Sequence, residues 1–562
     1  PTDPPAPGGG RGGQQQQGRR ELAWRADGQG LTYLEQEPPP PGERAGGGGR
    51  AGRGGRGAAS DAPQTEGRGQ RGAQRPDRLY QWLPPFDDSS RKVLYESNTR
   101  LSGHRYSPDM KMVFATERQG QDTIEVAIAL DQPAQRYVLA RYRSDDVNAN
   151  PGSLVSARGG GGGGGRGGGG GRGGRGGGGG GGPVLVSADG SSVFFLGTHH
   201  DENPNDSGPK TFLDKVAIRT GEKQRLFESD NNGVFERITT VLDAEQGRYI
   251  LSRESPKEVA QQFLVENGQR RQLTENRDYT PDITGATIER FTVERADGFK
   301  FRVTVNLPQN YQKGTRLPAL FWFYPREYQD QETYDRPDRT FNKNSFPNFG
   351  ARSMEYFVRL GYAVVEPDAP IVGPQGQMNN NYVHDLRNNL AAVIDELDRR
   401  ALVDRAKLAI GGHSYGAFST VNAMVHTPFF KAGIAGDGAY NRTLTPIGFQ
   451  SERRDLWEAP NVYLGMSPFL YANNLTGALL MYHGLADQNV GTDPINSIRL
   501  YHALNGLGKT AALYLYPLED HGPASKETLL DLWARWAAWL DKHVKNGDKA
   551  DRKITTDQAS RR

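Results

Sequence analysis

The sequence contains no cysteine and no run of 18 apolar residues. The first absence excludes disulfides, thiol catalysis and cysteine-based metal sites, and the second gives no reason to expect a transmembrane helix. No charge of one sign dominates, because 69 basic residues stand against 66 acidic ones and the net charge is +3. This near-balance offers no general argument for binding to nucleic acid or to membranes. We expect a chain that uses neither a metal nor another cofactor.

Glycine, by contrast, is abundant, with 73 residues among 562. Much of it lies in three low-complexity tracts, 1–18, 38–76 and 158–182. Such segments cannot bury a core, so we expect them to be disordered loops. Their Arg-Gly repeats raise an RNA-binding interpretation, but they lack the interleaved aromatic residues that stack on bases. We therefore favour surface insertions, whose closure costs rise only slowly with length.

Four similar segments recur in the N-terminal half. Each is a polar turn with an aspartate followed by an apolar strand, which is a hairpin signal. The aspartates are Asp27, Asp109, Asp189 and Asp243. Once the glycine-rich tracts are set aside, they recur at intervals of about 40 to 55 residues, which is typical of four-stranded propeller blades. The sequence therefore predicts an all-β propeller region of about four blades over residues 1–285.

The C-terminal half alternates between predicted strands and helices. An apolar strand at 362–366 precedes a helix at 383–397 with apolar residues on one face. Alternation of this kind indicates a mostly parallel sheet covered by helices. We expect this α/β domain to occupy residues 286–546, followed by a disordered tail at 547–562.

Residues 412–416 read Gly-His-Ser-Tyr-Gly, the pattern of a nucleophile elbow. A short apolar strand at 407–411 precedes it, and a helix is expected at 417–426. The glycines remove the Cβ atoms that would clash in a turn tight enough to expose Ser414. In a chain so rich in glycine the pattern alone is only a hypothesis.

An acid and a base follow the serine in the chain order of α/β-hydrolases. Asp487 lies just past the predicted strand 478–482, and His521 follows the strand 511–516. The carboxyl ends of parallel strands are where open α/β sheets carry their functional groups. The other histidines beyond Asp487, at 502 and 543, lie within predicted helices, and the rival acid at 493 lies where a helix begins.

These residue types suit covalent acyl transfer. The Ser414 hydroxyl becomes a competent nucleophile when His521 takes its proton, and Asp487 orients the imidazole and stabilises the imidazolium. The backbone N–H of Tyr415 is expected to donate a hydrogen bond to the oxyanion. The triad by itself does not choose between peptide and ester substrates.

The catalytic region resembles the prolyl oligopeptidase family of serine peptidases. The elbow, the pattern His483-Gly484-x-x-Asp487 and the pair His521-Gly522 match the family, as does the opening hairpin at 297–308. The likeness is strongest to the family's glutamyl endopeptidase branch and covers roughly residues 286–545. The segments that carry it are 321–328, 438–446, 456–459 and 466–469.

The resemblance implies further site residues. The family places a tyrosine hydroxyl in the oxyanion hole after the strand that precedes the first helix, and Tyr324 matches that position. The branch implies cleavage after glutamate, whose carboxylate suits an arginine. Arg442 and Arg454 are the candidates, with a solvated arginine or a structural ion pair as the alternative for each. The family also implies a propeller, usually of seven blades, so we expect further blades upstream of Pro1; a closed four-bladed propeller is the alternative.

The resulting hypothesis is a serine peptidase that prefers glutamate at the scissile position of peptide substrates. An acylaminoacyl- or dipeptidyl-peptidase, or an esterase with the same triad, is the alternative. A non-enzymatic, RNA-binding propeller scaffold is a third interpretation. The sequence does not choose between endo- and exopeptidase action, and it leaves the oligomeric state and the compartment open.

Overall fold

The structure is a computed structural model that describes residues 19–37, 75–120, 122–144, 146–157, 182–201, 206–335 and 342–546. The chain divides into two compact units, and the second begins at Asp278, ahead of the residue 286 expected from the sequence. Residues 342–346 group with the first unit. The expected disordered tracts and tail lie outside the described residues, apart from positions 75, 76 and 182.

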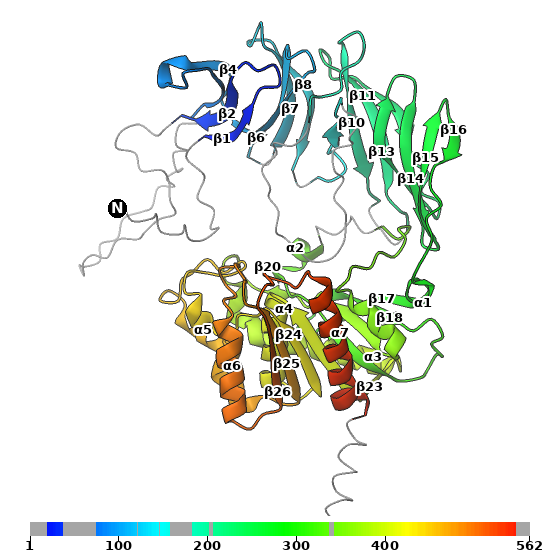
Figure 1. Cartoon of the computed structure of the whole chain (residues 1–562), viewed down its shortest axis with the longest axis vertical. Coiled ribbons are helices and arrows are strands. Elements are labelled where there is room, and N and C mark those ends of the chain that lie inside the picture. The colour runs from blue at the N-terminus through cyan, green and yellow to red at the C-terminus, as the bar shows by residue number, and fades with distance from the viewer. Residues whose placement is uncertain are drawn as a thin grey trace, which may run out of the picture. The chain divides into compact units, whose positions relative to one another are not determined.

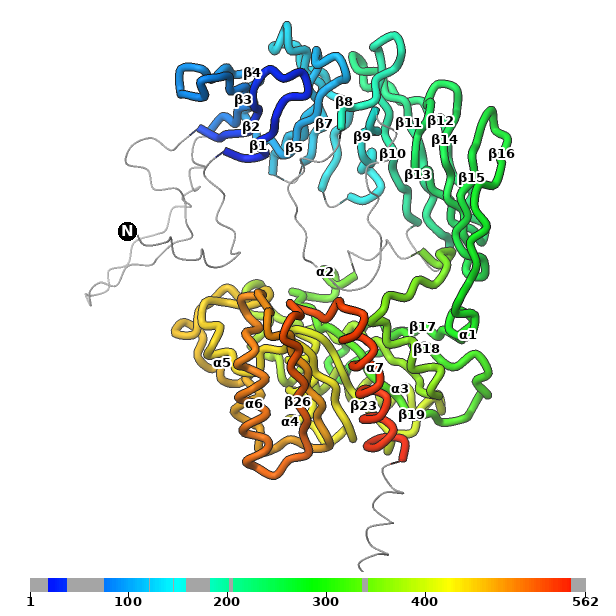
Figure 2. Tube along the Cα trace, viewed as in Figure 1, coloured from blue at the N-terminus to red at the C-terminus, as the bar shows by residue number. Residues whose placement is uncertain are grey.

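In its described residues, the first unit consists of four antiparallel sheets that follow one another along the chain, each of four strands (Figure 2). The first sheet has β1 (Arg20–Trp24), β2 (Leu31–Gln36), β3 (Asp77–Trp82) and β4 (Arg91–Ser97). The second has β5 (Arg100–Tyr106), β6 (Met112–Gln119), β7 (Asp122–Ala129) and β8 (Arg136–Arg143). The third has β9 (Ser153–Leu154), β10 (Ser192–His199), β11 (Lys210–Ala217) and β12 (Lys223–Glu228). The fourth has β13 (Phe235–Asp243), β14 (Arg248–Ser255), β15 (Glu258–Glu266) and β16 (Gln269–Gln272).

The recurring aspartates are turn residues of these blades. Asp27 Oδ1 accepts a hydrogen bond from the N–H of Gln29 at 3.0 Å, and Asp189 Oδ1 accepts one from the N–H of Ser191 at 3.0 Å. Asp109 and Asp243 make the same contact with a backbone N–H two residues ahead. An aspartate that bonds to the backbone in this way stabilises a tight turn. The repeat in the sequence is therefore one turn used once in each blade.

Neighbouring blades pack through apolar clusters. Leu79 of the first blade and Val126 of the second are buried in one cluster. Phe195 of the third blade belongs to a cluster with residues of the second, and Leu251 of the fourth to a cluster with residues of the third. Since the second and third sheets each bury one face against the sheet before and the other against the sheet after, their strands carry apolar residues on both sides.

The second unit is built on an eight-stranded sheet with the order β17-β18-β21-β19-β23-β24-β25-β26 (Figure 1). From β21 to β26 all neighbours pair in parallel, and β17 and β18 run antiparallel at one edge. The strands are β17 (Thr287–Glu294), β18 (Lys300–Leu307), β19 (Leu317–Trp322), β21 (Ala363–Pro367), β23 (Val403–His413), β24 (Ala432–Gly436), β25 (Ala478–Gly484) and β26 (Ala511–Tyr516). A separate pair consists of β20 (Glu327–Tyr328) and β22 (Ile371–Val372).

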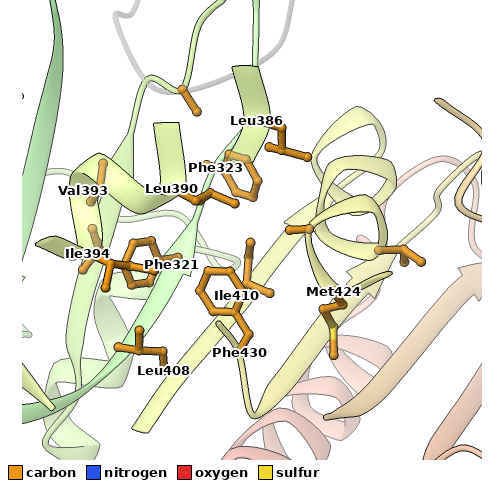
Figure 3. Close-up of a cluster of buried hydrophobic side chains, with 14 of the residues drawn as sticks. Phe321, Phe323, Leu386, Leu390, Val393, Ile394, Leu408, Ile410, Met424 and Phe430 are labelled. Atoms are coloured by element: carbon orange, nitrogen blue, oxygen red, sulfur yellow. The ribbon is translucent and has the colours of Figure 1, made fainter. Parts of the chain in front are cut away.

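Helices cover both faces of this sheet. One face buries Phe321, Leu408 and Ile410 against the helices that carry Leu390 and Met424 (Figure 3). The opposite face packs on the last long helix through Leu532, Trp536 and Leu540. The α-helices are α1 (Pro281–Thr284), α2 (Gln331–Asp335), α3 (Tyr382–Arg399), α4 (Tyr415–His426), α5 (Pro460–Met466), α6 (Ile495–Gly506) and α7 (Lys526–Leu540). Among the described residues, every helix falls short of the length or hydrophobicity that crossing a membrane requires.

Two leucines on α7 provide a matched test of this packing. Leu532 is fully buried, whereas Leu530 is 61% exposed. We expect Leu532→Ala to lower the free energy of unfolding of the second unit by about 2–5 kcal/mol, because it leaves a cavity in the core. Leu530→Ala should change it by no more than about 0.5 kcal/mol. Urea unfolding followed by tryptophan fluorescence measures both, since Trp533 and Trp536 lie on the same helix. Equal losses in the two variants would contradict the packing.

Candidate active site

The predicted site residues follow neighbouring parallel strands. Ser414 comes directly after β23, Asp487 lies just past β25, and His521 lies in the loop after β26. Because β23, β24, β25 and β26 are consecutive parallel strands, the carboxyl ends of β23, β25 and β26 meet at one edge of the sheet. The sheet thus brings together three side chains that are 73 and 34 residues apart in the sequence.

Ser414 sits in a strained turn between β23 and α4. Its φ of 58° and ψ of −118° lie outside the regions that residues with a side chain ordinarily adopt. A Cβ on Gly416 would meet the carbonyl oxygen of Phe323 at 2.4 Å, and one on Gly412 would meet the backbone of Gly416 at 2.4 Å. Both positions therefore require glycine, which explains the sequence pattern around the serine.

A continuous hydrogen-bonded chain joins the three side chains. His521 Nε2 lies 2.9 Å from Ser414 Oγ, and His521 Nδ1 lies 2.8 Å from Asp487 Oδ2. The imidazole can therefore accept the serine proton at Nε2 while its Nδ1–H donates to the carboxylate. This is the geometry expected of a nucleophile, a base and an orienting acid.

Asp487 is held as a carboxylate by several donors. Its Oδ2 also accepts a hydrogen bond from Thr492 Oγ1 at 3.0 Å and lies 3.2 Å from His483 Nε2, and its Oδ1 accepts one from the N–H of Asn489 at 2.9 Å. Burial by itself raises the pKa of Asp487, but the hydrogen bonds from His483, His521 and the backbone outweigh it and hold the pKa well below its ordinary range. The acid therefore stays ionised wherever the histidine can act as a base.

The N–H of Tyr415 and the hydroxyl of Tyr324 both lie next to Ser414. The N–H of Tyr415 is at the first position of α4, where no carbonyl of the helix can accept it. Tyr324 follows β19 by two residues, and its hydroxyl interacts with Ser414 and accepts a hydrogen bond from Gln450 Nε2 at 3.0 Å. Burial raises the pKa of Tyr324, so its hydroxyl keeps the proton that it would donate.

Arg442 packs against three aromatic rings, one of which belongs to Tyr415, the residue after Ser414. Its guanidinium carbon is 4.1 Å from the ring centre of Phe418, 4.3 Å from that of Phe449 and 5.5 Å from that of Tyr415. The residue is only 4% exposed, and its Nε has no hydrogen-bond partner. Within the described part of the chain, no carboxylate forms a salt bridge with it. Burial lowers the pKa of Arg442, as expected for a cation that lacks a counter-ion.

Arg454 has a different environment. Its Nε and terminal nitrogen donate to the two carboxylate oxygens of Glu452 at 2.9 and 2.7 Å. The Glu452 side chain is fully buried, so this bidentate pair satisfies a charge that would otherwise be costly. Arg454 thus forms the structural ion pair that was its alternative, whereas Arg442 forms no salt bridge among the described residues.

Sequence analysis did not identify several residues of the network. His413, which is half-buried, pairs with the fully buried Asp437 beside His521, and His483 contacts Asp487. Asp437, His483 and Asp487 offer possible metal-ligand atoms within 4.8 Å of one another. Each of these atoms already takes part in hydrogen bonds, including His483 Nε2 to the carbonyl of Thr492 at 2.7 Å. The arrangement therefore fits a proton-bearing network better than a metal centre.

The rival residues of the sequence analysis lie elsewhere. Asp493 accepts a hydrogen bond from the N–H of Ile495 at the start of α6. His502 is exposed on α6, and the ring of His543 packs on Trp539 at 4.4 Å between ring centres. None of these contacts involves the three residues that the sheet edge brings together.

Comparison with known proteins agrees with this geometry. Residues 347–547 match the model of the prolyl oligopeptidase family. The probable chloroplastic glutamyl endopeptidase of Arabidopsis thaliana is 37% identical over 61% of this chain and 37% of its own length. The protein of the same name from Oryza sativa subsp. japonica is 35% identical over 82% of this chain and 49% of its own length. The chain thus spans half or less of the length of these relatives.

A solved structure shares the fold. The crystal structure of Porphyromonas gingivalis dipeptidyl peptidase 4 has a TM-score of 0.52 and 15% sequence identity, covering 93% of this chain and 74% of that one. The expected combination of β-propeller blades with an α/β-hydrolase domain is confirmed. The family match shows that residues 347–547 form a domain of the prolyl oligopeptidase family, and the solved structure shows a shared fold.

Proposed function

We propose that this chain is a serine peptidase that hydrolyses peptide bonds through an acyl-enzyme intermediate. The hydrogen-bonded chain from Ser414 through His521 to Asp487 carries this proposal. Ser414 Oγ attacks the scissile carbonyl carbon as its proton passes to His521 Nε2. The imidazolium then protonates the leaving nitrogen, the carbon–nitrogen bond breaks, and an ester to Ser414 remains.

Deacylation uses the same groups in reverse. A water molecule loses a proton to His521 Nε2 and attacks the ester carbon, and the imidazolium returns the proton to Ser414 Oγ as the acid product leaves. In both steps negative charge develops on the carbonyl oxygen. The N–H of Tyr415 and the hydroxyl of Tyr324 are the donors that we assign to that oxygen.

We further propose that the substrate residue before the scissile bond is glutamate and that Arg442 binds its carboxylate. A cation that is almost fully buried without a salt bridge is destabilised until an anion reaches it. The names of the two plant relatives also support a preference for glutamate. Because Arg442 lies next to the ring of Tyr415, a substrate carboxylate bound to it would lie close to Ser414.

Glu327 is the internal carboxylate that could compete for Arg442. It accepts hydrogen bonds from the hydroxyl of Tyr415 at 3.2 Å and of Ser451 at 3.4 Å. Burial raises the pKa of Glu327. The nearby charge of Arg442 acts in the opposite direction and lowers the pKa of Glu327, so the two residues interact even without a salt bridge.

The first test removes the nucleophile. We expect Ser414→Ala to lower kcat by about 10⁴-fold or more, because the remaining histidine and acid have no hydroxyl to activate. The variant should also resist labelling by a fluorophosphonate probe, which reacts with activated serines. Intact-mass spectrometry measures the labelling, and thermal unfolding checks that the variant is folded. Labelling of Ser414→Ala at the wild-type rate would reject the assignment.

The second test removes one oxyanion donor. Tyr324→Phe deletes only the hydroxyl, so we expect kcat to fall by about 100- to 1000-fold. KM should change little, because the lost hydrogen bond strengthens only as the oxyanion forms. Steady-state kinetics on one fluorogenic peptide separates the two parameters. A rise in KM at constant kcat would instead place Tyr324 in ground-state binding.

The third test concerns specificity. In Arg442→Gln we expect kcat/KM for a peptide with glutamate before the scissile bond to fall by about 100-fold or more, because that carboxylate loses its buried partner. The glutamine analogue of the same peptide should be affected far less. Arg453→Gln, at the exposed neighbour of Arg454, is the matched control and should leave both values unchanged.

A panel of peptides with glutamate, proline or alanine before the scissile bond, together with an acyl ester, completes this comparison. Unaltered glutamate preference in Arg442→Gln would remove Arg442 from the pocket. A wild-type enzyme that prefers the other peptides or the ester would favour the acylaminoacyl-peptidase, dipeptidyl-peptidase or esterase alternative.

A further inference from the structure

His413 and Asp437 form a second histidine–carboxylate pair at the edge of the sheet. His413 is the last residue of β23, and Asp437 is the first residue after β24. His413 Nε2 lies 3.1 Å from Asp437 Oδ2. Asp437 is fully buried, and its φ of 50° lies in the left-handed region, which few residues other than glycine adopt. A buried carboxylate in a strained conformation is the kind of feature found at functional sites.

The pair lies against the catalytic histidine. The ring centres of His413 and His521 are 4.7 Å apart, with an angle of 50° between the rings. A Cβ on Gly522, the residue after His521, would lie 3.3 Å from His413 Nε2. The ring of His413 therefore limits the directions in which the imidazole of His521 can tilt.

Asp437 also reaches the acid side of the triad. Its Oδ1 accepts a hydrogen bond from the N–H of Gly484 at 2.8 Å and lies 4.0 Å from His483 Nε2. That nitrogen is in turn 3.2 Å from Asp487 Oδ2. His483 thus lies between two carboxylates, Asp437 and Asp487, and the second of these also contacts His521.

The charge of the second pair follows from its surroundings. Burial lowers the pKa of His413, while Asp437 raises it and the neighbouring His521 and Arg352 lower it. These three are the titratable or charged groups that act on His413, and they come from the loops after β24, after β26 and before β21. A neutral His413 donates its Nε2–H to Asp437 and leaves the pair with one negative charge.

We propose that His413 and Asp437 are positioning residues for His521: the His413 ring fixes the orientation of the imidazole, and the Asp437 carboxylate stabilises the imidazolium that forms during attack. The proposal rests on the proposed function, because it requires His521 to accept the proton of Ser414. The two residues have separable effects. Asp437 acts by charge, whereas His413 acts by contact.

The test is the pH dependence of fluorophosphonate labelling of Ser414, which needs no peptide substrate. The acid limb of this profile reports protonation of the base. Asp437→Asn removes a negative charge at nearly constant shape, so the imidazolium is disfavoured and the acid limb moves to lower pH, by about one unit. The plateau rate falls by about tenfold, because a weaker base assists the attack less.

His413→Gln gives a different signature. Its amide can still donate to Asp437, so the charge remains and the acid limb stays in place. The ring contact with His521 is lost, and the plateau rate falls by about tenfold because the imidazole is held less firmly. His502→Gln, on the exposed surface of α6, is the control and leaves the whole profile unchanged.

If folded Asp437→Asn has its acid limb at the same pH as the wild-type protein, the charge effect is overturned. A carboxylate with only a structural role would lower the plateau rate and leave the acid limb in place. If folded His413→Gln is labelled at the wild-type plateau rate, the contact effect is overturned. If Asp437→Asn does not fold, this result alone decides the proposal. If the wild-type protein is not labelled, the proposed function itself is overturned. This outcome differs from those that overturn only the positioning roles of His413 and Asp437.

Discussion

The parallel register of four neighbouring strands is the constraint on which the site depends. β23 pairs with β24 from Ala409 to His413, and the ladder continues past the strand when the N–H of Ser414 donates to the carbonyl of Gly436 at 2.8 Å. The N–H of Asp437 donates likewise to the carbonyl of Tyr482 at 3.0 Å. Backbone hydrogen bonds thus position the first residues beyond the strands as firmly as the strands themselves, and a shift of register by one residue would turn each side chain to the opposite face.

In this arrangement the acid of the site is more deeply buried than the base. The side chain of Asp487 is fully buried, whereas that of His521 is 23% exposed. The buried Asp487 carboxylate is stabilised by hydrogen-bond donors at fixed positions. These donors need not reorganise as positive charge develops on His521. The imidazole between acid and solvent can exchange protons with substrate and water. The opposite arrangement, with an exposed acid, would weaken the interaction by solvent screening.

Much of this could be predicted from the sequence, because the relevant patterns are local. Strand 511–516 matches β26, and the elbow, the acid and the base follow their strands as expected. Other features depend on residues distant in sequence. Nothing near Asp437 signals that it meets His413, 24 residues earlier. The two arginines were also indistinguishable as cations after β24, although Glu452, two residues before Arg454, was a usable sign of an ion pair. Such pairings become visible only once the sheet has set which loops are neighbours.

Tyr415 connects the proposed specificity to the proposed chemistry. Its ring packs beside the guanidinium of Arg442, its hydroxyl donates to Glu327, and its N–H is the donor that we assign to the oxyanion. A carboxylate bound by Arg442 would therefore lie against the residue whose N–H must meet the scissile carbonyl. Binding energy accelerates a reaction only when it acts in the transition state. Because Tyr415 contributes both to the proposed pocket and to the proposed oxyanion hole, binding of the substrate side chain can align the scissile carbonyl. By this argument a substrate without the carboxylate loses kcat as well as affinity.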